Sequence, residues 1–486
     1  MMSPSEWEAL DMTDLAALVR KGDIAPREVT ETAIARIEAL NPVVNAVVIT
    51  AFEEALDELS RRTDRPPFLG MPYLVKDLYA PVRGLPLTNG SRIFDKLTPD
   101  FDSTLVARLR AAGFVFPART NSPEFGLSAS TEPYRYGPTR NPWNREHIAG
   151  GSSGGAGAAV ASGMVPVAHA TDSAGSIRIP ASCNGLVGLK PTRGLNPYGP
   201  HRGDAAHGIS HEHAVTRSVR DTAALLDITA GPDAGAPYFS LPPQGGFVAA
   251  LRRPSPPLKI GFTTETFAGR KIDPECAEGV LAAARLLEEL GHTVEESRPD
   301  FDVERMVDNM MTVLIGSLTP MINAWERQLE RPFRPEDVEP QAHGAFAKAR
   351  STDLDSYLTA LAAMQLEVRK MGRFFENHDI LITPTLSSPP PRLGCLPTSI
   401  SNVDEFMERL FALCPFTAPF NASGQPAASL PLHWSSSGLP IGIQFVAGYG
   451  EDAKLLQLAA QVEQAAPWFA RRPLLAKQDR STPATP

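Results

Sequence analysis

The chain has 486 residues, of which 43% are apolar and 21% are charged, an ordinary balance that excludes a wholly disordered protein. This length can bury a large core without disulfides or a structural metal. The net charge is −9 and no segment is rich in lysine and arginine. The chain is therefore a poor candidate for binding nucleic acid, whose phosphates would repel it.

The cysteines and the N-terminal segment favour a reducing compartment, the cytoplasm. Cys183, Cys276, Cys395 and Cys414 are widely spaced and form no CxxC pair, so we expect neither a disulfide framework nor a cysteine-bound zinc. The N-terminal segment carries acidic residues where a secretory signal has an apolar core. No run of about 18 apolar residues predicts a membrane span. We therefore expect a cytoplasmic protein that does not enter a membrane.

The pattern of apolar residues predicts alternating helices and strands. Helices are expected, in chain order, at 13–19, 26–40, 46–62, 103–112, 156–162, 274–290 and 451–463. Strands are expected at 72–76, 114–118, 165–170, 258–263, 292–296, 379–383, 427–432 and 441–446. Asn41-Pro42 is expected to end the second helix, because proline disrupts helical hydrogen bonding. The alternation is typical of α/β architecture.

The other segments complete the expected organisation. Residues 303–377 are expected to be mostly helical, and residues 384–402 to form a loop rich in proline and serine. Residues 473–486 are largely polar and are expected to form a loose tail. We find no internal repeat and no clear linker, so residues 1–486 are expected to form one large domain.

Residues 150–192 hold the densest pattern with chemical meaning. Two loops of small residues flank the helix and strand expected there, and they carry Ser152 and Ser153 in the first loop and Ser173 and Ser176 in the second. Glycine lets such loops turn backbone N–H groups toward a developing negative charge. A serine hydroxyl on such a loop is a candidate covalent nucleophile. By composition alone, an ordinary turn is the commoner explanation.

Other known glycine-rich motifs match the first loop only in part. The first loop lacks the GK[ST] ending of a Walker loop and the third small residue of a dinucleotide fingerprint. The triplet Gly150-x-Ser152-x-Gly154 matches the nucleophile elbow of an α/β-hydrolase. That elbow needs a preceding strand, which the polar segment before it does not predict, and a later histidine, for which His378 and His433 are available. An esterase of this type remains an alternative.

Four histidines, His201, His207, His211 and His213, raise the possibility of a metal site. No HExxH or acid-bracketed pattern surrounds them, and residues 194–214 are expected to form an irregular loop. We therefore expect these histidines to be solvated or to line a pocket, and we expect no metal and no cofactor.

The stretch 150–192 resembles the signature of the amidase signature family. The resemblance continues, in order, through 74–77 (LVKD), 119–126 (RTNSPEFG), 141–144 (NPWN), 420–426 (FNASGQP) and 438–444 (GLPIGIQ). It implies an α/β fold with a central mixed β-sheet covered on both faces by helices. The signature core would span residues of about 70–220.

The resemblance also implies a catalytic triad. Ser176 matches the nucleophile, Ser152 the bridging serine that follows a non-proline cis peptide in the family, and Lys76 the base. A hydroxyl is a weak nucleophile until a neighbour removes its proton. A lysine can accept that proton only as a neutral amine, so burial must lower its pKa from about 10.4.

Further roles follow from the same resemblance. The backbone N–H groups of Ser173, Ala174, Gly175 and Ser176 would form the oxyanion hole. Ser153, Asp172 and Arg178 would support the two loops. Many members of the family have glycine in place of Ala174, but alanine keeps the backbone donor, so we expect an intact oxyanion hole.

The resemblance implies a small-molecule amide or carbamate as substrate, with no nucleic acid or membrane partner and a possible homodimer. Within the family, the chain most resembles the branch that hydrolyses 6-aminohexanoate oligomers. A carbamate hydrolase or an aryl-acylamidase would share the triad. A glutamine amidotransferase subunit would need partner proteins and a surface for tRNA, which the acidic charge disfavours.

Two segments are candidates for the substrate pocket. The loop 194–213 has charges balanced to within one unit, from Arg202, Asp204 and Glu212, which favours a neutral substrate. The helical region 303–377 supplies apolar residues that could adapt to an aliphatic chain, or could simply form core. These residues are Met306, Met310, Met311, Leu314, Leu318 and Met321.

Overall fold

A computed structural model describes residues 1–94 and 97–475. Its largest sheet has eight strands, parallel among the first three and antiparallel elsewhere. In order across the sheet they are β10 (Thr293–Glu296), β9 (Lys259–Phe262), β11 (Ile380–Pro384), β13 (Pro440–Ala447), β12 (Ala427–Trp434), β7 (Val187–Lys190), β8 (His211–Thr216) and β6 (Val167–Asp172).

Helices cover both faces of this sheet, as the alternation along β13 shows. Ile441, Ile443 and Phe445 pack in one apolar cluster with α8 (Val219–Thr229), α10 (Pro274–Glu289) and α17 (Asp452–Ala465). The residues between them face the other way: the N–H of Gly442 donates to Ser182 and Gln444 accepts from Arg178, both on α7 (Arg178–Asn184). Successive side chains of a strand point to opposite faces, so the core continues on both sides. The predicted mixed sheet with helices on both faces is confirmed.

Two small sheets lie beside the large one. One contains β1 (Val47–Thr50), β5 (Ala118–Thr120) and β3 (Val75–Lys76), and the other pairs β2 (Met71–Pro72) with β4 (Phe114–Val115). A parallel bridge between Leu74 and Ala168 joins the segment before β3 to β6. Because of this bridge, Lys76 lies beside the end of β6, where the second serine loop begins.

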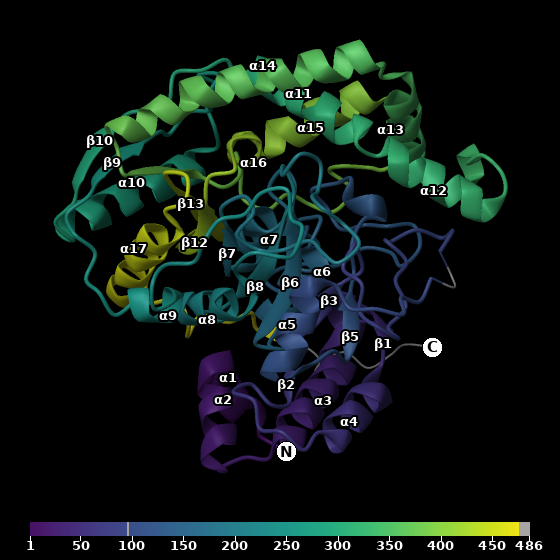
Figure 1. Ribbon diagram of the computed structural model, residues 1–486. Helices are drawn as coiled ribbons and strands as arrows, with labels where there is room; N and C mark the ends of the chain where they lie inside the picture. Colours follow the sequence, from purple (N-terminus) through teal and green to yellow (C-terminus); the bar gives the residue numbers. More distant parts are fainter. Residues whose placement is uncertain (95–96, 476–486) are drawn as a thin grey trace, which may run out of the picture.

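The remaining helices form two groups. Figure 1 shows α11 to α15 along one side of the molecule and the N-terminal helices α1 to α4 at the opposite end. The first group contains α11 (Val303–Gly316), α12 (Thr319–Leu329), α13 (Pro340–Ser351), α14 (Leu354–Gly372) and α15 (Val403–Leu413). The N-terminal helices are α1 (Pro4–Ala9), α2 (Met12–Lys21), α3 (Pro26–Val44) and α4 (Phe52–Arg61).

Shorter elements connect these groups. They are α5 (Thr104–Ala112), α6 (Gly154–Ala161), α9 (Phe247–Ala250), α16 (Pro419–Ser423), and the 3₁₀ turns η1 (Glu124–Gly126), η2 (Pro335–Asp337) and η3 (Arg373–Glu376). The mostly helical character of 303–377 is thus confirmed.

Two predicted boundaries near the N-terminus are wrong. Asn41-Pro42 does not end the second helix: α3 continues to Val44 with Pro42 inside its last turn, where one missing N–H costs a single helical bond. The helix expected at 46–62 begins only at Phe52, because Val47–Thr50 form β1 and pair with β5. This strand is rich in β-branched residues, which favour strands over helices.

Most of the tail predicted at 473–486 lies outside the described residues, and the organisation of the chain as one domain stays a prediction. Among the residues that the structure describes, no helix is both long and apolar enough to cross a bilayer.

Candidate active site

Lys76 is buried at the point where β3 meets β6. Its side chain has no solvent exposure. Its Nζ lies 2.6 Å from Ser152 Oγ and 2.8 Å from Thr171 Oγ1. Burial lowers the pKa of Lys76 well below its usual range, and the charges of Asp172 and Glu212 offset only part of this effect. The site therefore favours a neutral amine in contact with a serine hydroxyl.

The first serine loop lies against the end of β6. The Gly151–Ser152 peptide bond is cis, as the family resemblance implies. Ser153 Oγ donates to the carbonyl of Thr171 and accepts from its N–H, both at 3.3 Å. A Cβ on Gly126 would lie 3.3 Å from Ser152 Oγ, so the glycine that ends the 119–126 motif keeps space beside this hydroxyl.

The second serine loop joins β6 to α7 and carries Ser176. This serine is partly exposed, unlike Ser152, which is 2% exposed. Ser176 Oγ makes no hydrogen bond to any part of the chain that the structure describes. Catalytic hydrogen bonds are often absent or long before substrate binds. The hydroxyl is thus not tied to another group of the chain.

Gly175 is the residue that lets this loop turn. Its φ is +131°, which side chains rarely adopt, and a Cβ there would lie 2.5 Å from Thr417 Oγ1. Ala174, in contrast, is not among the residues with a positive φ, so its backbone does not require glycine. Its carbonyl accepts a hydrogen bond from Thr417 Oγ1 at 2.5 Å.

The prediction for the oxyanion hole needs one correction. The N–H of Gly175 donates to Asp172 Oδ1 at 2.7 Å, so it is not free to bind a substrate oxygen. Within the described residues, no hydrogen bond uses the N–H groups of Ser173, Ala174 or Ser176. Three of the four predicted donors therefore stay available. Sequence patterns could not show which N–H the carboxylate takes.

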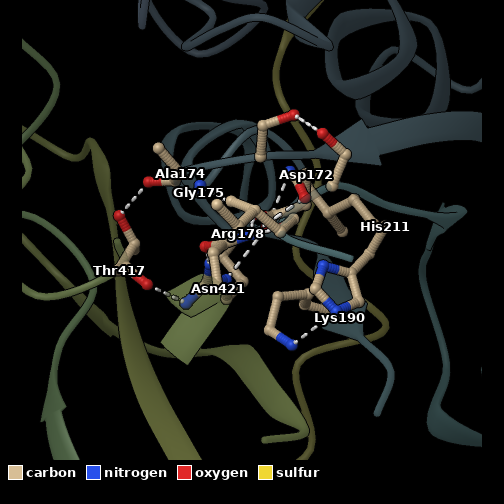
Figure 2. A network of polar contacts seen from close by, with 12 residues as sticks. Asp172, Ala174, Gly175, Arg178, Lys190, His211, Thr417 and Asn421 are labelled. Carbon is tan, nitrogen blue, oxygen red and sulfur yellow. Dashed lines mark hydrogen bonds and ion pairs between the residues drawn. The ribbon is translucent and has the colours of Figure 1, made fainter. Parts of the chain in front are cut away.

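A buried network fixes the base of this loop (Figure 2). Asp172 and Arg178, both without solvent exposure, form a two-bond ion pair with distances of 2.9 Å. Arg178 also donates to Gln444 Oε1 at 2.7 Å and to the Thr417 carbonyl at 2.9 Å. Asn421 Nδ2 donates to Asp172 Oδ1 at 2.9 Å. Burial alone would raise the pKa of Asp172, but Arg178 and Asn421 hold it well below its usual range.

Sequence reasoning missed several of these partners. Thr171, which binds Lys76, lies in the matched stretch 150–192 directly before Asp172, so its role could have been suspected. Asn421 lies in the 420–426 stretch that matches the family, so its role could have been suspected. Thr417 lies outside every matched stretch. Ser210, whose hydroxyl lies 2.6 Å from that of Ser173, falls in a segment predicted as irregular loop.

The histidines separate into two pairs. His211 and His213 lie on β8 and are 2% exposed, so the expected loop is wrong at this point and these two are neither solvated nor pocket-lining. Pairing with β6 and β7 overrides the polar sequence. His201 and His207 line a cavity, as predicted. Within the described residues, no three His, Cys, Asp or Glu side chains are grouped to hold a metal.

Two large cavities are lined by residues near those that pack against the second serine loop. The larger, of about 1150 Å³, is lined by polar and aromatic side chains that include Tyr79, Tyr198, His201, His207, Glu212 and Tyr357. The smaller, of about 920 Å³, combines apolar side chains, including Phe267, Val307, Met311, Met407, Phe411 and Pro415, with charged side chains of both signs, including Lys271, Glu304, Lys348 and Asp404. Neither wall includes Ser176 itself. The smaller cavity is lined by Pro415, two residues before Thr417, which binds the second serine loop. The larger cavity is lined by Ala206, which packs in the same apolar cluster as Ala174.

The apolar residues of 303–377 divide between core and cavity. Met306 and Met310 have no exposure and belong to the core. Met311 lines the smaller cavity and Met321 the larger. Only part of this group can therefore meet a ligand.

The nucleophile-elbow alternative finds no support in the geometry. The segment before Ser152 contributes isolated bridges at His147 and Ile148 in place of the required strand. His378 lies beside Glu295, at 2.8 Å, rather than beside a serine.

Glu124, from the 119–126 motif, ties the helical region to the site. Its Oε2 accepts from the N–H of Glu339, the residue before α13, at 2.6 Å. Both carboxyl groups are buried, at 4% exposure each. Burial raises the pKa of Glu124 to about 7, with the charge of Glu339 as a minor contribution.

This raised pKa predicts a dependence of stability on pH. The contribution of Glu124 is full below the unfolded-state pKa of about 4.3 and is lost as the pH rises through about 7. Glu124→Gln should remove this loss, so its melting temperature relative to wild type should rise between pH 5.5 and pH 8. Over this pH range the gain in unfolding free energy is about 2 kcal/mol, from about 1.5 pH units between pH 5.5 and the folded pKa of about 7. Glu54→Gln, at an exposed position, is the control and should show no such trend.

Comparisons with known proteins agree with this geometry. The sequence model of the amidase family matches residues 28–456. A 6-aminohexanoate-cyclic-dimer hydrolase of Paenarthrobacter ureafaciens is 39% identical over 98% of this chain and 99% of its own length. A solved structure of a 6-aminohexanoate cyclic dimer hydrolase gives a TM-score of 0.89 at 39% identity, over 96% of this chain and 99% of that one. A bacterial aryl acylamidase of the amidase signature family gives 0.86 at 30% identity, over 94% of this chain and 96% of its own. The chain therefore belongs to the amidase signature family and is an amidase.

Proposed function

We propose that this amidase works through an acyl-enzyme in which Ser176 is the nucleophile, Ser152 relays the proton and Lys76 is the base. The observation that carries the proposal is the buried contact of 2.6 Å between Lys76 Nζ and Ser152 Oγ. Burial favours the neutral amine there, which is the form that can accept a proton. Ser176 lies on the adjoining loop, partly open to solvent.

The first half of the reaction forms an ester. The proton of Ser176 Oγ passes to Ser152 Oγ as the Ser152 proton passes to Lys76 Nζ. Ser176 Oγ bonds to the carbonyl carbon of the substrate, and the carbonyl π electrons move to the oxygen. When the tetrahedral intermediate collapses, the C–N bond breaks and the leaving amine takes a proton from Ser152, which Lys76 replaces.

The second half returns the enzyme to its starting state. A water gives up its proton by the same relay and attacks the ester on Ser176. The acid product leaves as Ser176 recovers its proton. Throughout, the N–H groups of Ser173, Ala174 and Ser176 are the donors we assign to the oxyanion. Asp172 and Arg178 hold the loop in shape, and Ser153 holds the first loop against β6.

We infer that the substrate is a neutral amide, with a cyclic or linear 6-aminohexanoate oligomer as the leading candidate. Support comes from the 39% identical relative and from the apolar side chains of the smaller cavity, where Met311 and Phe267 suit an aliphatic chain. A panel of linear amides, cyclic amides, anilides and carbamates tests this. We expect the highest kcat/KM on a 6-aminohexanoate oligomer, and a highest value on a carboxylate-bearing amide such as glutamine would contradict the neutral pocket.

The mechanism also predicts metal independence and an alkaline preference. Because Lys76 must be neutral to act, kcat/KM should rise with pH along one basic limb. Incubation with EDTA followed by gel filtration should leave the rate unchanged. Loss of activity that zinc restores would contradict the proposal.

A further inference from the structure

Glu212 shares one face of the sheet with the lysine site. It lies on β8 directly opposite Thr171 of β6. Side chains of directly paired residues project to the same face. Thr171 accepts a hydrogen bond from Lys76 Nζ on that face, at 2.8 Å. The carboxylate of Glu212 therefore belongs to the immediate surroundings of Lys76.

The carboxylate of Glu212 has almost no partner. The residue is 7% exposed and forms part of the wall of the larger cavity. Within the described residues, the imidazole of His169 faces this carboxylate, with Nε2 at 3.6 Å from Oε2, which is beyond hydrogen-bond distance. No hydrogen bond from the described part of the chain reaches this carboxylate. A buried carboxylate without a cation is costly, so a nearby group that gains positive charge is strongly favoured.

The other carboxylate near Lys76 is already neutralised. Asp172 pairs with Arg178 and accepts hydrogen bonds from Asn421 and from the N–H groups of Gly175 and Ile177. Its lone pairs are therefore used in holding the loop. Of the two carboxylates that act on Lys76, Glu212 alone has its charge uncompensated by a hydrogen-bonded cation.

We propose that Glu212 is a positioning residue for the base: its carboxylate stabilises the protonated form of Lys76 that arises while Ser176 attacks the substrate. This inference rests on the proposed function, in which the Ser176 proton reaches Lys76 through Ser152. Lys76 then gains a full positive charge in a site without water exposure. Glu212 supplies the compensating charge at that moment and leaves the resting lysine neutral.

The charged and titratable groups around Lys76 and Glu212 determine how a substitution of Glu212 changes the titration of Lys76. Asp172 and Glu212 are the charges that act on Lys76. Tyr73, Tyr198 and His169 face Glu212, and burial, followed by the charge of Glu212, raises the pKa of both tyrosines. Arg202 also acts on Tyr198 from the cavity side. Neither tyrosine ionises at moderate pH, so neither can account for a shift of the limb assigned to Lys76.

The test is the pH dependence of Ser176 sulfonylation by phenylmethylsulfonyl fluoride, in which Ser176 Oγ displaces fluoride from sulfur, followed by intact mass. In Glu212→Gln, the limb assigned to Lys76 should move down by about one pH unit and the alkaline plateau should fall about tenfold. Glu212→Met, of similar length and without charge, should give the same shift and serves if Glu212→Gln does not unfold cooperatively. Glu212→Asp should keep the limb within about half a unit of wild type.

Asp221→Asn is the control, because it makes the same chemical change at a buried carboxylate that binds Thr13 and Met12 on the N-terminal helices. It should not move the limb. An unmoved limb in both Glu212→Gln and Glu212→Met, whatever the rate, would overturn the role of Glu212. A wild-type enzyme that shows no basic limb, or a label on a residue other than Ser176, would instead overturn the proposed function.

Discussion

Lys76→Met should lower kcat/KM by about a thousandfold and abolish its rise with pH. The substitution keeps the length and burial of the side chain and removes the group that accepts the Ser176 proton. General-base catalysis contributes about 10²–10⁴ in rate, and the oxyanion donors remain in this variant, so some activity should persist. Steady-state rates between pH 6 and pH 10 measure both effects.

Lys190→Met is the matched control. Lys190 is also fully buried, and its pKa is also lowered, first by burial and then by the charge of Arg178. Its Nζ binds the carbonyl of Pro191 at 3.0 Å and touches neither serine of the proposed triad. Lys190→Met should therefore keep the basic limb. A limb that survives in Lys76→Met would contradict the assignment of the base.

Lys76→Met should also change how the free energy of unfolding depends on pH. The pKa of Lys76 is lower in the folded state than the value of about 10.4 in the unfolded chain. Its contribution to stability is therefore full above pH ~10.4 and is lost as the pH falls toward the folded pKa. Urea unfolding should show Lys76→Met gaining on wild type as the pH is lowered from 10 to 7.

Arg178→Met should destabilise the fold by about 3–5 kcal/mol, because it leaves Asp172 buried without a cation. Acceptors on Gln444 and Thr417 lose their donor as well. The low pKa of Asp172 means that the pair stabilises wild type above the unfolded pKa of about 3.9 and less as the pH falls below it. Urea unfolding at pH 8 measures the loss.

The double variant Asp172→Asn/Arg178→Met separates charge from packing. It removes the unpaired charge, so it should recover part of the stability that Arg178→Met loses. Arg178→Met should also lose less at pH 5 than at pH 8, since the carboxyl can then take a proton. If the single and double variants lose the same free energy of unfolding, Arg178 does not stabilise the fold through its ion pair with Asp172.

Much of the fold could be predicted because local chemistry and tertiary structure agree. Ser103 caps α5 through a bond from the N–H of Val106, and Gly113 ends it in a left-handed conformation, as its sequence implies. Asp273 caps α10 by accepting a hydrogen bond from the N–H of Glu275. The strand β8 was missed because its His-Glu-His sequence is polar, and only pairing with β6 and β7 makes it a strand.

For the candidate site, sequence could name residues but not their contacts. Lys76 and Ser152 lie 76 positions apart, and only the bridge between Leu74 and Ala168 shows why they meet. The diversion of the Gly175 N–H to Asp172 depends on loop geometry that no motif describes. Thr417 and Glu212 reach the site through tertiary contacts, so local patterns gave Thr417 no role and placed Glu212 only among the charges of a pocket loop.

The most direct test of the account is the identity of the nucleophilic serine, found as the residue that a sulfonyl fluoride modifies. Wild-type protein, Ser176→Ala and Ser152→Ala would each be treated with phenylmethylsulfonyl fluoride and digested, and the adduct mapped by mass spectrometry. We predict one adduct on Ser176 in wild type, none in Ser176→Ala, and a much slower reaction at Ser176 in Ser152→Ala. An adduct on Ser152 in wild type, or undiminished labelling of Ser176→Ala, would contradict the account.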